Sequence, residues 1–135
     1  MIAPRDVFAE MRQRWLANDV TFEPDQLADE AVLEMPMAAP GRPTRVQGRA
    51  QILDFTRAGR AALPIRFDDC RNVIVHQTTD PEVIVVEYEL VATVPATGVT
   101  ASAPFVGVLR ARGGKLLHWR EYQPTYTIMQ ALGPA

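Results

Sequence analysis

Apolar residues recur with two different periods along this chain, and the change of period separates a helical part from a strand part. Before residue 64, apolar positions return every three or four residues, which predicts amphipathic helices over 4–18 and 49–63. Pro4 suits the first turn of the earlier helix, and Pro64 ends the later one. From residue 65 onward the period is two, which is typical of antiparallel strands. The predicted strands cover about 66–78, 82–94, 101–112 and 115–126.

The segment between the two predicted helices is rich in proline. After Pro24, residues 25–29 are long enough for one short helical turn, and 31–35 are expected to form a first strand. Pro36 limits that strand or places it at an edge. Residues 36–45 hold three prolines and a glycine, which predicts a loop near the mouth of whatever the fold encloses. The expected architecture is α+β, with a curved antiparallel sheet wrapped around the N-terminal helices.

Composition and charge argue against some classes of binding partner. We expect a single domain over residues 1–135, since this length buries one ordinary core. The net charge is −2 and the 14 basic residues are scattered, which argues against nucleic acid as a partner. The aliphatic run 83–86 is too short to cross a membrane. Cys70 is the one cysteine, so no internal disulfide can form, and a reducing cytoplasm is the expected location.

The last predicted strand, 115–126, carries the strongest sign of a pocket. It follows the pair Gly113-Gly114, which is typical of a tight hairpin turn. Alternation puts four of its side chains on one face: Leu117, Trp119, Glu121 and Gln123. An aromatic ring beside a carboxylate on the inner face of a late strand suggests the wall of a pocket.

The register of the meander can be predicted from its turns. If Arg112 and Lys115 flank a two-residue turn, Val106 lies opposite Glu121. If the preceding hairpin is centred within 96–99, Val106 also lies opposite Glu89, although a one-residue bulge would move Glu89 to the other face. Backbones two strands apart are separated by roughly 10 Å. Two carboxyl groups on one face at that spacing could hold a small ligand or a water molecule between them.

Several stretches together resemble the SnoaL-like branch of the nuclear transport factor 2-like superfamily. They are the N-terminal helix, VQGRAQI at 46–52, PATG at 95–98 and GGKLLHWREY at 113–122. The resemblance covers nearly the whole chain and implies a cone-shaped α+β fold. The superfamily includes ketosteroid isomerases, polyketide cyclases, dehydratases, epoxide hydrolases and binding modules, so the fold leaves the activity open.

The limonene epoxide hydrolase family is similar around the predicted acids. By that resemblance Glu121 matches the carboxylate that activates water, and Glu89 matches the one that protonates the epoxide. Glu87 stands where that family has a bridging arginine. Val32 and Glu34 stand where it has a tyrosine and an asparagine that help to hold the water. At three of these five positions, this chain therefore has a residue of different chemistry from the one in that family.

Two other branches of the superfamily imply different roles. In the ketosteroid isomerase family, the general-base aspartate matches Met35 and the oxyanion-stabilising tyrosine matches Trp15. Methionine cannot take a proton, which argues against that mechanism. The SnoaL polyketide cyclases use an acidic base on a pocket strand, a role that either Glu121 or Glu89 could fill.

The candidate site is defined by the strand pattern, the predicted register and the family resemblances. Glu121 and Glu89 are the expected catalytic residues. The expected ligand-binding residues are Trp119, Trp15, Met35, Glu87, Glu34 and Val106. Glu87 and Glu89 are equally well explained as the solvated face of a strand, and tryptophans are more often core than ligand platforms. His76, His118 and Cys70 lack metal-ligand spacing, so neither a metal nor a cofactor is expected.

Two functions of different class follow. One is a cofactor-independent acid/base enzyme, of isomerase, cyclase, dehydratase or hydrolase type, acting on a small apolar or amphipathic ligand. The other is a noncatalytic ligand-binding or dimerisation module. If Glu89 and Glu121 face inward, the outer face of the sheet becomes apolar, which predicts a homodimer through that face. The residues expected there are Tyr88, Leu90, Phe105, Leu109, Leu116 and Tyr122.

Overall fold

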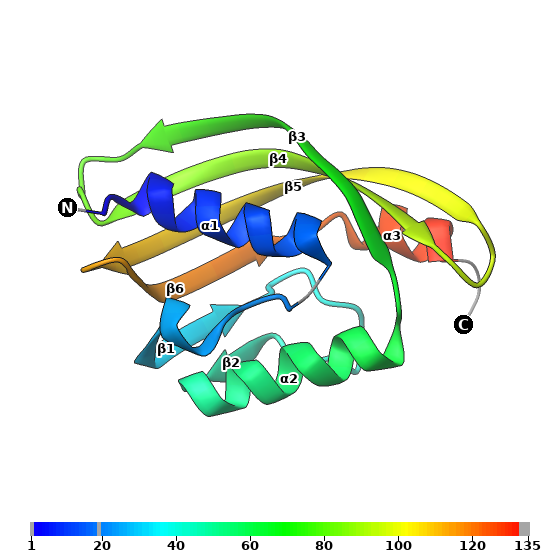
Figure 1. The fold of residues 1–135 in the computed structure, drawn as a ribbon, viewed down its shortest axis with the longest axis horizontal. Helices are drawn as coiled ribbons and strands as arrows, with labels where there is room; N and C mark the ends of the chain where they lie inside the picture. The colour runs from blue at the N-terminus through cyan, green and yellow to red at the C-terminus, as the bar shows by residue number, and fades with distance from the viewer. Residues whose placement is uncertain (1, 19, 133–135) are drawn as a thin grey trace.

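The computed structural model describes residues 2–18 and 20–132 (Figure 1). The predicted α+β class is confirmed: helices lie against a six-stranded curved sheet. The helical elements are α1 (Pro4–Ala17), the short 3-10 helix η1 (Pro24–Gln26), α2 (Arg49–Ala62) and α3 (Thr125–Leu132). The strands are β1 (Leu27–Glu34), β2 (Arg45–Gln47), β3 (Arg66–Gln77), β4 (Val83–Val94), β5 (Val99–Arg112) and β6 (Lys115–Tyr122).

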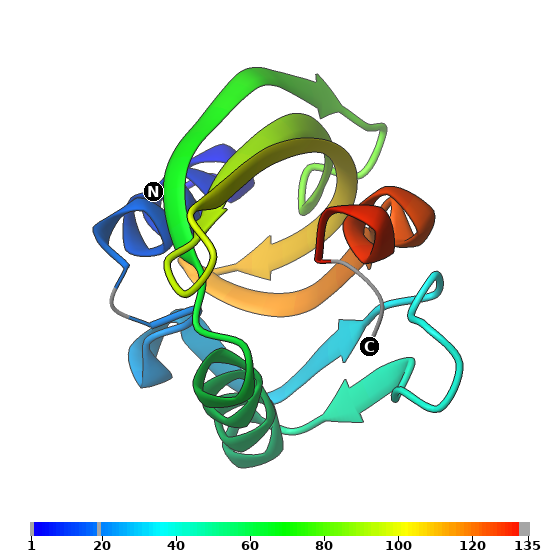
Figure 2. The same cartoon turned by 90° about the vertical axis from the view of Figure 1, so that its right-hand side faces the viewer.

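The sheet runs in the order β2-β1-β6-β5-β4-β3 and curls without closing, as the end-on view of Figure 2 shows. Neighbouring strands are antiparallel except β1 and β6, which are parallel. The expectation of a purely antiparallel sheet is wrong at this pair. The alternation of side chains within each strand does not predict the relative direction of β1 and β6, because these strands are far apart in the sequence and are connected through α2 and the rest of the sheet. β1 also begins at Leu27, inside the predicted helical turn 25–29.

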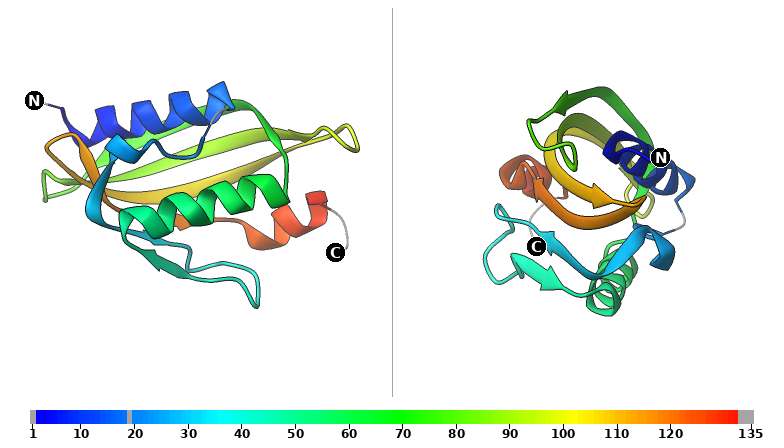
Figure 3. Two further views of the ribbon diagram at one scale, coloured as in Figure 1. Left: turned by 60° about the horizontal axis from the view of Figure 1, so that its bottom comes forward. Right: turned by 90° about the vertical axis from the view of Figure 1, so that its left-hand side faces the viewer.

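The two long helices cover the concave side of the sheet and form its core. Helix α1 contacts β3, β4 and β5, and α2 lies beside β1 (Figure 3). The apolar stripe of α1 is buried, as its spacing predicted; its members are Val7, Phe8, Met11 and Trp15. The Trp15 ring lies 5.6 Å from the Tyr88 ring and 6.2 Å from the Trp119 ring, measured between centroids. These aromatic contacts join α1 to strands β4 and β6.

The β5–β6 hairpin begins as predicted and then changes register. Arg112 lies opposite Lys115, around two glycines that both have positive φ angles. The pairing then shifts by one residue, because Arg110 faces His118 while Ala111 faces Leu116. The extra residue in β6 is a bulge, and beyond it every side chain of β6 takes the opposite face from the one that simple pairing gives.

The register of the acids therefore differs from the expected one. Val106 lies opposite Tyr122 rather than Glu121, and Glu121 lies opposite Gly107. In the β4–β5 hairpin, Val106 lies opposite Glu87 rather than Glu89. That second difference is two residues and leaves the face unchanged, whereas the bulge in β6 exchanges faces. Glu121 thus faces the concave side, while Glu89 and Val106 face the convex side.

The same exchange overturns the predicted outer face. Of the six residues expected there, four are buried in the core: Tyr88, Leu90, Leu109 and Leu116. Phe105 also packs against the core, and its ring stacks on Tyr88 at 5.5 Å. Of these six residues, Tyr122 alone lies on the convex face, opposite Val106. The convex face is therefore less apolar than the sequence analysis expected.

Gly107 is required by the close approach of an indole ring. A Cβ atom built on Gly107 would lie 2.0 Å from Cη2 of the Trp119 ring and 2.5 Å from its Cζ3. Since Trp119 is fully buried, the ring has no free space into which it could move. The absence of a side chain at position 107 thus allows Trp119 to lie flat on the sheet next to Glu121.

We predict that Gly107→Ala destabilises the protein by about 1–3 kcal/mol, the usual cost of overpacking a core. Gly59→Ala is the matched control, because Gly59 is in α2 and a Cβ there meets nothing within 4 Å. That control is expected to be neutral or to stabilise by up to about 1 kcal/mol. Urea unfolding of both variants measures the difference. Equal free energies of unfolding would contradict the tight Gly107–Trp119 packing.

Candidate functional site

A cavity of about 320 Å³ lies between the concave face of the sheet, α2 and α3. Its size is within the range of small-molecule sites. Its lining is mainly aromatic and aliphatic, with side chains from α1, α2, α3 and from strands β1, β3, β4, β5 and β6. α3 borders the cavity through Ile128 and Leu132, and the hydroxyl of Thr125 donates to the carbonyl oxygen of Met37. The 36–45 loop therefore contacts α3, which borders the cavity, and the expected position of this loop near the mouth stays a prediction.

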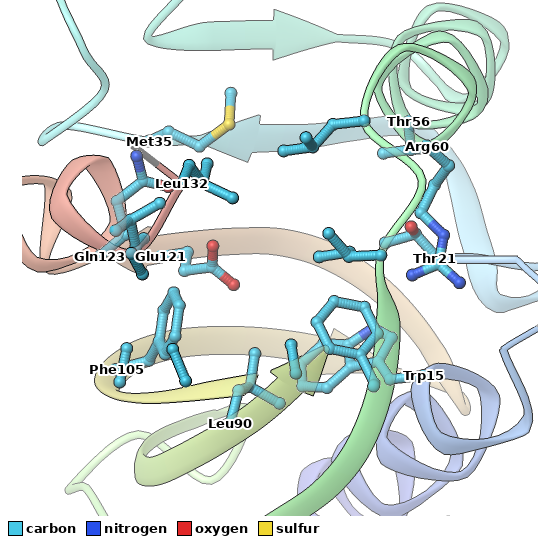
Figure 4. A pocket seen from close by; sticks show the side chains of 18 of the residues that line it. Trp15, Thr21, Met35, Thr56, Arg60, Leu90, Phe105, Glu121, Gln123 and Leu132 are labelled. Carbon is cyan, nitrogen blue, oxygen red and sulfur yellow. The ribbon is translucent and has the colours of Figure 1, made fainter. Parts of the chain in front are cut away.

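Glu121 is the one acidic side chain among the described residues that line this cavity. Figure 4 shows its carboxylate pointing into the space between Phe105 and Trp15. The hydroxyl of Tyr88, on β4, donates to Oε2 of Glu121 at 2.9 Å. Tyr88 is 2% exposed, so this hydrogen bond is shielded from water. The sheet thus supplies an acid and its hydrogen-bond donor from two strands.

Burial raises the pKa of Glu121 above its ordinary value of 4.5. The hydrogen bond from Tyr88 and the nearby Trp119 side chain stabilise the carboxylate and lower the pKa of Glu121, but burial is the larger effect. The pKa of Tyr88 is raised well above its usual value, first by burial and then by the adjacent Glu121. Tyr88 therefore remains a protonated donor while Glu121 can exchange a proton.

The residues predicted for the site divide between the two faces of the sheet. Trp15, Met35, Trp119 and Glu121 line the cavity. The other four candidates do not, and the expectation that they share one pocket with Glu121 is wrong; they are Glu34, Glu87, Glu89 and Val106. The alternation of β1, β4 and β5 places these four side chains on the convex face, where Glu87, Glu89 and Val106 border a second, more open hollow.

Each of the three outward glutamates has a basic partner. Glu89 pairs with Arg71, and Glu87 pairs with His76 at 2.6 Å. Glu34 contacts His118 on the neighbouring strand. The solvated-face reading of Glu87 and Glu89 is therefore the correct one. A two-carboxylate mechanism that joins Glu89 to Glu121 does not fit this geometry.

The structure describes residues 2–18 and 20–132. In these ranges no three His, Cys, Asp or Glu side chains are grouped so that they could hold a metal ion. No helix of the described chain is long and apolar enough to span a bilayer. Cys70 is buried, and its carbonyl oxygen accepts hydrogen bonds from Arg12.

A family model described as a SnoaL-like domain matches residues 8–119, which include most of the cavity wall. The chain belongs to the SnoaL-like family. An uncharacterised PhzA/B-like protein of Pseudomonas aeruginosa is 32% identical over 109 residues, covering 81% of this chain and 75% of that protein. The resemblance inferred from the sequence is thereby confirmed.

Solved structures place this SnoaL-like chain in the nuclear transport factor 2-like fold. The crystal structure of a proposed isomerase from Bacillus subtilis superposes with a TM-score of 0.88 at 21% identity, covering 98% of this chain and 94% of that one. The Δ5-3-ketosteroid isomerase of a Mycobacterium species superposes with a TM-score of 0.73 at 20% identity, covering 93% and 97%. At these identities the likeness establishes the cone-shaped fold.

Two residues of the site in this SnoaL-like protein are not predicted by the sequence: Tyr88, which donates to Glu121, and Arg60. Tyr88 was placed on the outer face by the same one-residue error that misplaced Glu89. Arg60 lines the cavity from the last turn of α2. A lone arginine near a helix end is normally solvated, so its sequence position carried no signal. The pairing of Tyr88 with Glu121 follows from the true register of β4, β5 and β6.

The raised pKa of Glu121 predicts a specific pH dependence of stability. A carboxyl whose pKa is higher in the folded chain contributes most stability below its unfolded pKa, and this contribution is lost as pH rises through the folded pKa. We therefore expect the Tm of the wild type, relative to Glu121→Gln, to fall as pH rises from about 4 to 8.

Glu82 provides a control of opposite sign. Its pKa is lowered, first by a hydrogen bond from Arg112 and further by Arg110, so its contribution is lost as pH falls. The Tm of the wild type relative to Glu82→Gln should fall toward low pH. Thermal melts of the three proteins across this range give both difference curves. A Glu121 curve with the same slope as the Glu82 curve would contradict the burial of the Glu121 carboxyl.

Proposed function

We propose that this SnoaL-like protein is a cofactor-independent acid/base enzyme that transfers a proton on a small, mostly apolar metabolite held in the cavity. The observation that carries the proposal is Glu121, a carboxyl group in an apolar cavity with a buried phenol donating to it. Desolvation moves the pKa of such a carboxyl toward neutral pH, where a group can both accept and return a proton.

The proposed reaction is proton transfer beside a carbonyl group. Glu121 takes a proton from a carbon adjacent to the carbonyl, and the electron pair of the C–H bond moves into an enolate. In a ketone with a carbon–carbon double bond between its β and γ carbons, this enolate is a dienolate. Return of the proton to the γ carbon moves the double bond next to the carbonyl, so the step is an isomerisation without net oxidation. Tyr88 holds Oε2 of Glu121 and fixes the carboxyl plane. The rings of Trp119 and Phe105 bound the space beside the substrate and exclude water.

The structural neighbours support this class of chemistry. The Mycobacterium structure is of a ketosteroid isomerase, and the Bacillus subtilis structure is of a proposed isomerase. The acid would nevertheless come from a different strand here, since the residue that resembles the isomerase base is Met35, which lines the cavity from the end of β1. We infer that Glu121 on β6 takes over the base role.

A noncatalytic ligand-binding module is the second candidate. The observation that favours it is also Met35, a position where a thioether replaces the carboxylate of the isomerase family. In that case the raised pKa of Glu121 would leave a neutral carboxyl that donates a hydrogen bond to a ligand. Both candidates use the same cavity, and turnover separates them.

The test uses 2-tetralone, a bicyclic ketone with acidic protons next to its carbonyl. We expect the wild type to accelerate exchange of these protons with D₂O above the buffer rate, as followed by proton NMR. Glu121→Gln should reduce this acceleration by about 10²–10⁴-fold, the usual contribution of a general base. Glu89→Gln is the matched control and should leave the rate unchanged, because Glu89 lies on the other face.

Two results would count against the enzyme. Equal exchange in the wild type and Glu121→Gln would remove Glu121 from the mechanism. Binding of 2-tetralone, seen as broadening of its signals, without accelerated exchange would support the binding module.

The homodimer expected from the sequence stays a prediction, but the residues available for its interface differ from those expected. The convex face presents Tyr122 with Val106 and Val85, interleaved with the paired glutamates. We propose that a second copy covers this face. Sedimentation equilibrium at micromolar concentration should show a dimer that Val106→Lys dissociates, whereas a monomeric wild type would contradict the proposal. The expected cytoplasmic location likewise stays a prediction.

A further inference from the structure

Two buried nitrogen atoms in the cavity wall have no hydrogen-bond partner among the described residues. They are Nε1 of Trp15 and Nη1 of Arg60. Trp15 is 4% exposed, so water outside the protein does not solvate its N–H group. A buried donor without a partner costs roughly 1–3 kcal/mol, and more when it is charged. Native proteins retain few such groups, and at a binding site a ligand can satisfy them.

Both donors lie on the same side of the cavity. Figure 4 shows Arg60 descending from α2 toward Thr21 and Trp15, away from Glu121 and Gln123. The guanidinium of Arg60 lies over the Phe67 ring, with its central carbon 5.0 Å from the ring centroid. This contact restrains the guanidinium plane and leaves Nη1 unpaired. Partial desolvation by burial also lowers the pKa of Arg60.

We infer that Arg60 and Trp15 anchor a carboxylate of the ligand, at the end of the cavity opposite Glu121. The inference rests on the proposed function and names its substrate class: an amphipathic metabolite with an apolar body, an anionic end and a reacting carbon. A carboxylate accepts several hydrogen bonds at once, and the planar guanidinium of arginine matches its two oxygens. The indole N–H adds one neutral donor and no acceptor that would repel the anion.

The charges that line the cavity favour one anion at that end. Arg60 is the one basic residue among the described residues of the lining, and Glu121 is the one acidic residue. A ligand carboxylate beside Arg60 is therefore neutralised there, with the apolar wall separating it from the Glu121 carboxyl. One cation and one indole donor suit a carboxylate better than the higher charge of a phosphate. The anchor would also fix which carbon of the ligand reaches Glu121.

The test compares 4-phenylbutyrate with its neutral, size-matched analogue 4-phenylbutanamide, using calorimetry at pH 7. We expect the carboxylate to bind about ten- to a hundredfold more tightly, the range for hydrogen bonds to a charged group. Arg60→Met should remove this preference while leaving amide binding within a few fold. Arg57→Met is the matched control, since Arg57 is exposed on the same helix and absent from the cavity lining.

A second measurement reads the Trp15 indole directly in the wild type and needs a variant only to assign its signal. The chain has two tryptophans, so its nitrogen-15 spectrum contains two indole signals, which Trp15→Phe assigns. Binding of 4-phenylbutyrate should shift the Trp15 indole proton downfield, and binding of the amide should shift it less. This readout is specific to a hydrogen bond at Trp15 Nε1.

The anchor and the catalytic proposal can fail separately, because the anchor is tested by binding and Glu121 by proton exchange. Equal affinities for the two probes, or no binding of 4-phenylbutyrate at millimolar concentration, would overturn the anchor. Equal losses in Arg60→Met and Arg57→Met would also overturn it, because the preference would then come from the overall charge. A preserved preference in Arg57→Met together with its loss in Arg60→Met supports it.

Discussion

The register of the β5–β6 hairpin is the constraint on which the site depends. One extra residue in β6, next to the turn, changes which side chains face the helices. Without this bulge, Glu121 would point to the convex face and Tyr122 would enter the core. With it, the strand delivers Trp119 and Glu121 to the same concave surface as Tyr88. A local irregularity thus sets the chemical character of the whole cavity.

Several contacts around Glu121 compensate for the burial of its carboxyl. Tyr88 donates to it from the middle of the sheet, and the absence of a side chain at Gly107 lets Trp119 pack beside it. The surrounding walls are apolar, so the carboxyl experiences a low dielectric and holds its proton more tightly. Its protonation is therefore coupled to the packing of the core, and substitutions in that core would alter the chemistry of Glu121 as well as the stability of the fold.

The sequence predicted the fold better than the arrangement of the acids. The apolar stripe of α1, the change to a period of two and the Gly113-Gly114 turn are local signals, and each appears in the structure. The bulge left no such signal, because Leu116 and Leu117 are both apolar and either phase of the strand looks acceptable. The neighbouring Trp119 and the family resemblance predict Glu121 as a site residue. Glu89 follows only from continuous strand pairing, which the bulge interrupts. The sequence does not predict Arg60, because its surroundings depend on contacts between distant segments.

The position of the two tryptophans has an optical consequence. Trp15 and Trp119 both line the cavity, and the chain has no third indole. All of the indole emission of the protein therefore originates at the cavity wall. A ligand that displaces water or contacts either ring changes the intensity and wavelength of that emission directly. Events confined to the convex face leave both rings in the same surroundings, so intrinsic fluorescence distinguishes occupancy of the cavity from association of chains without any added label.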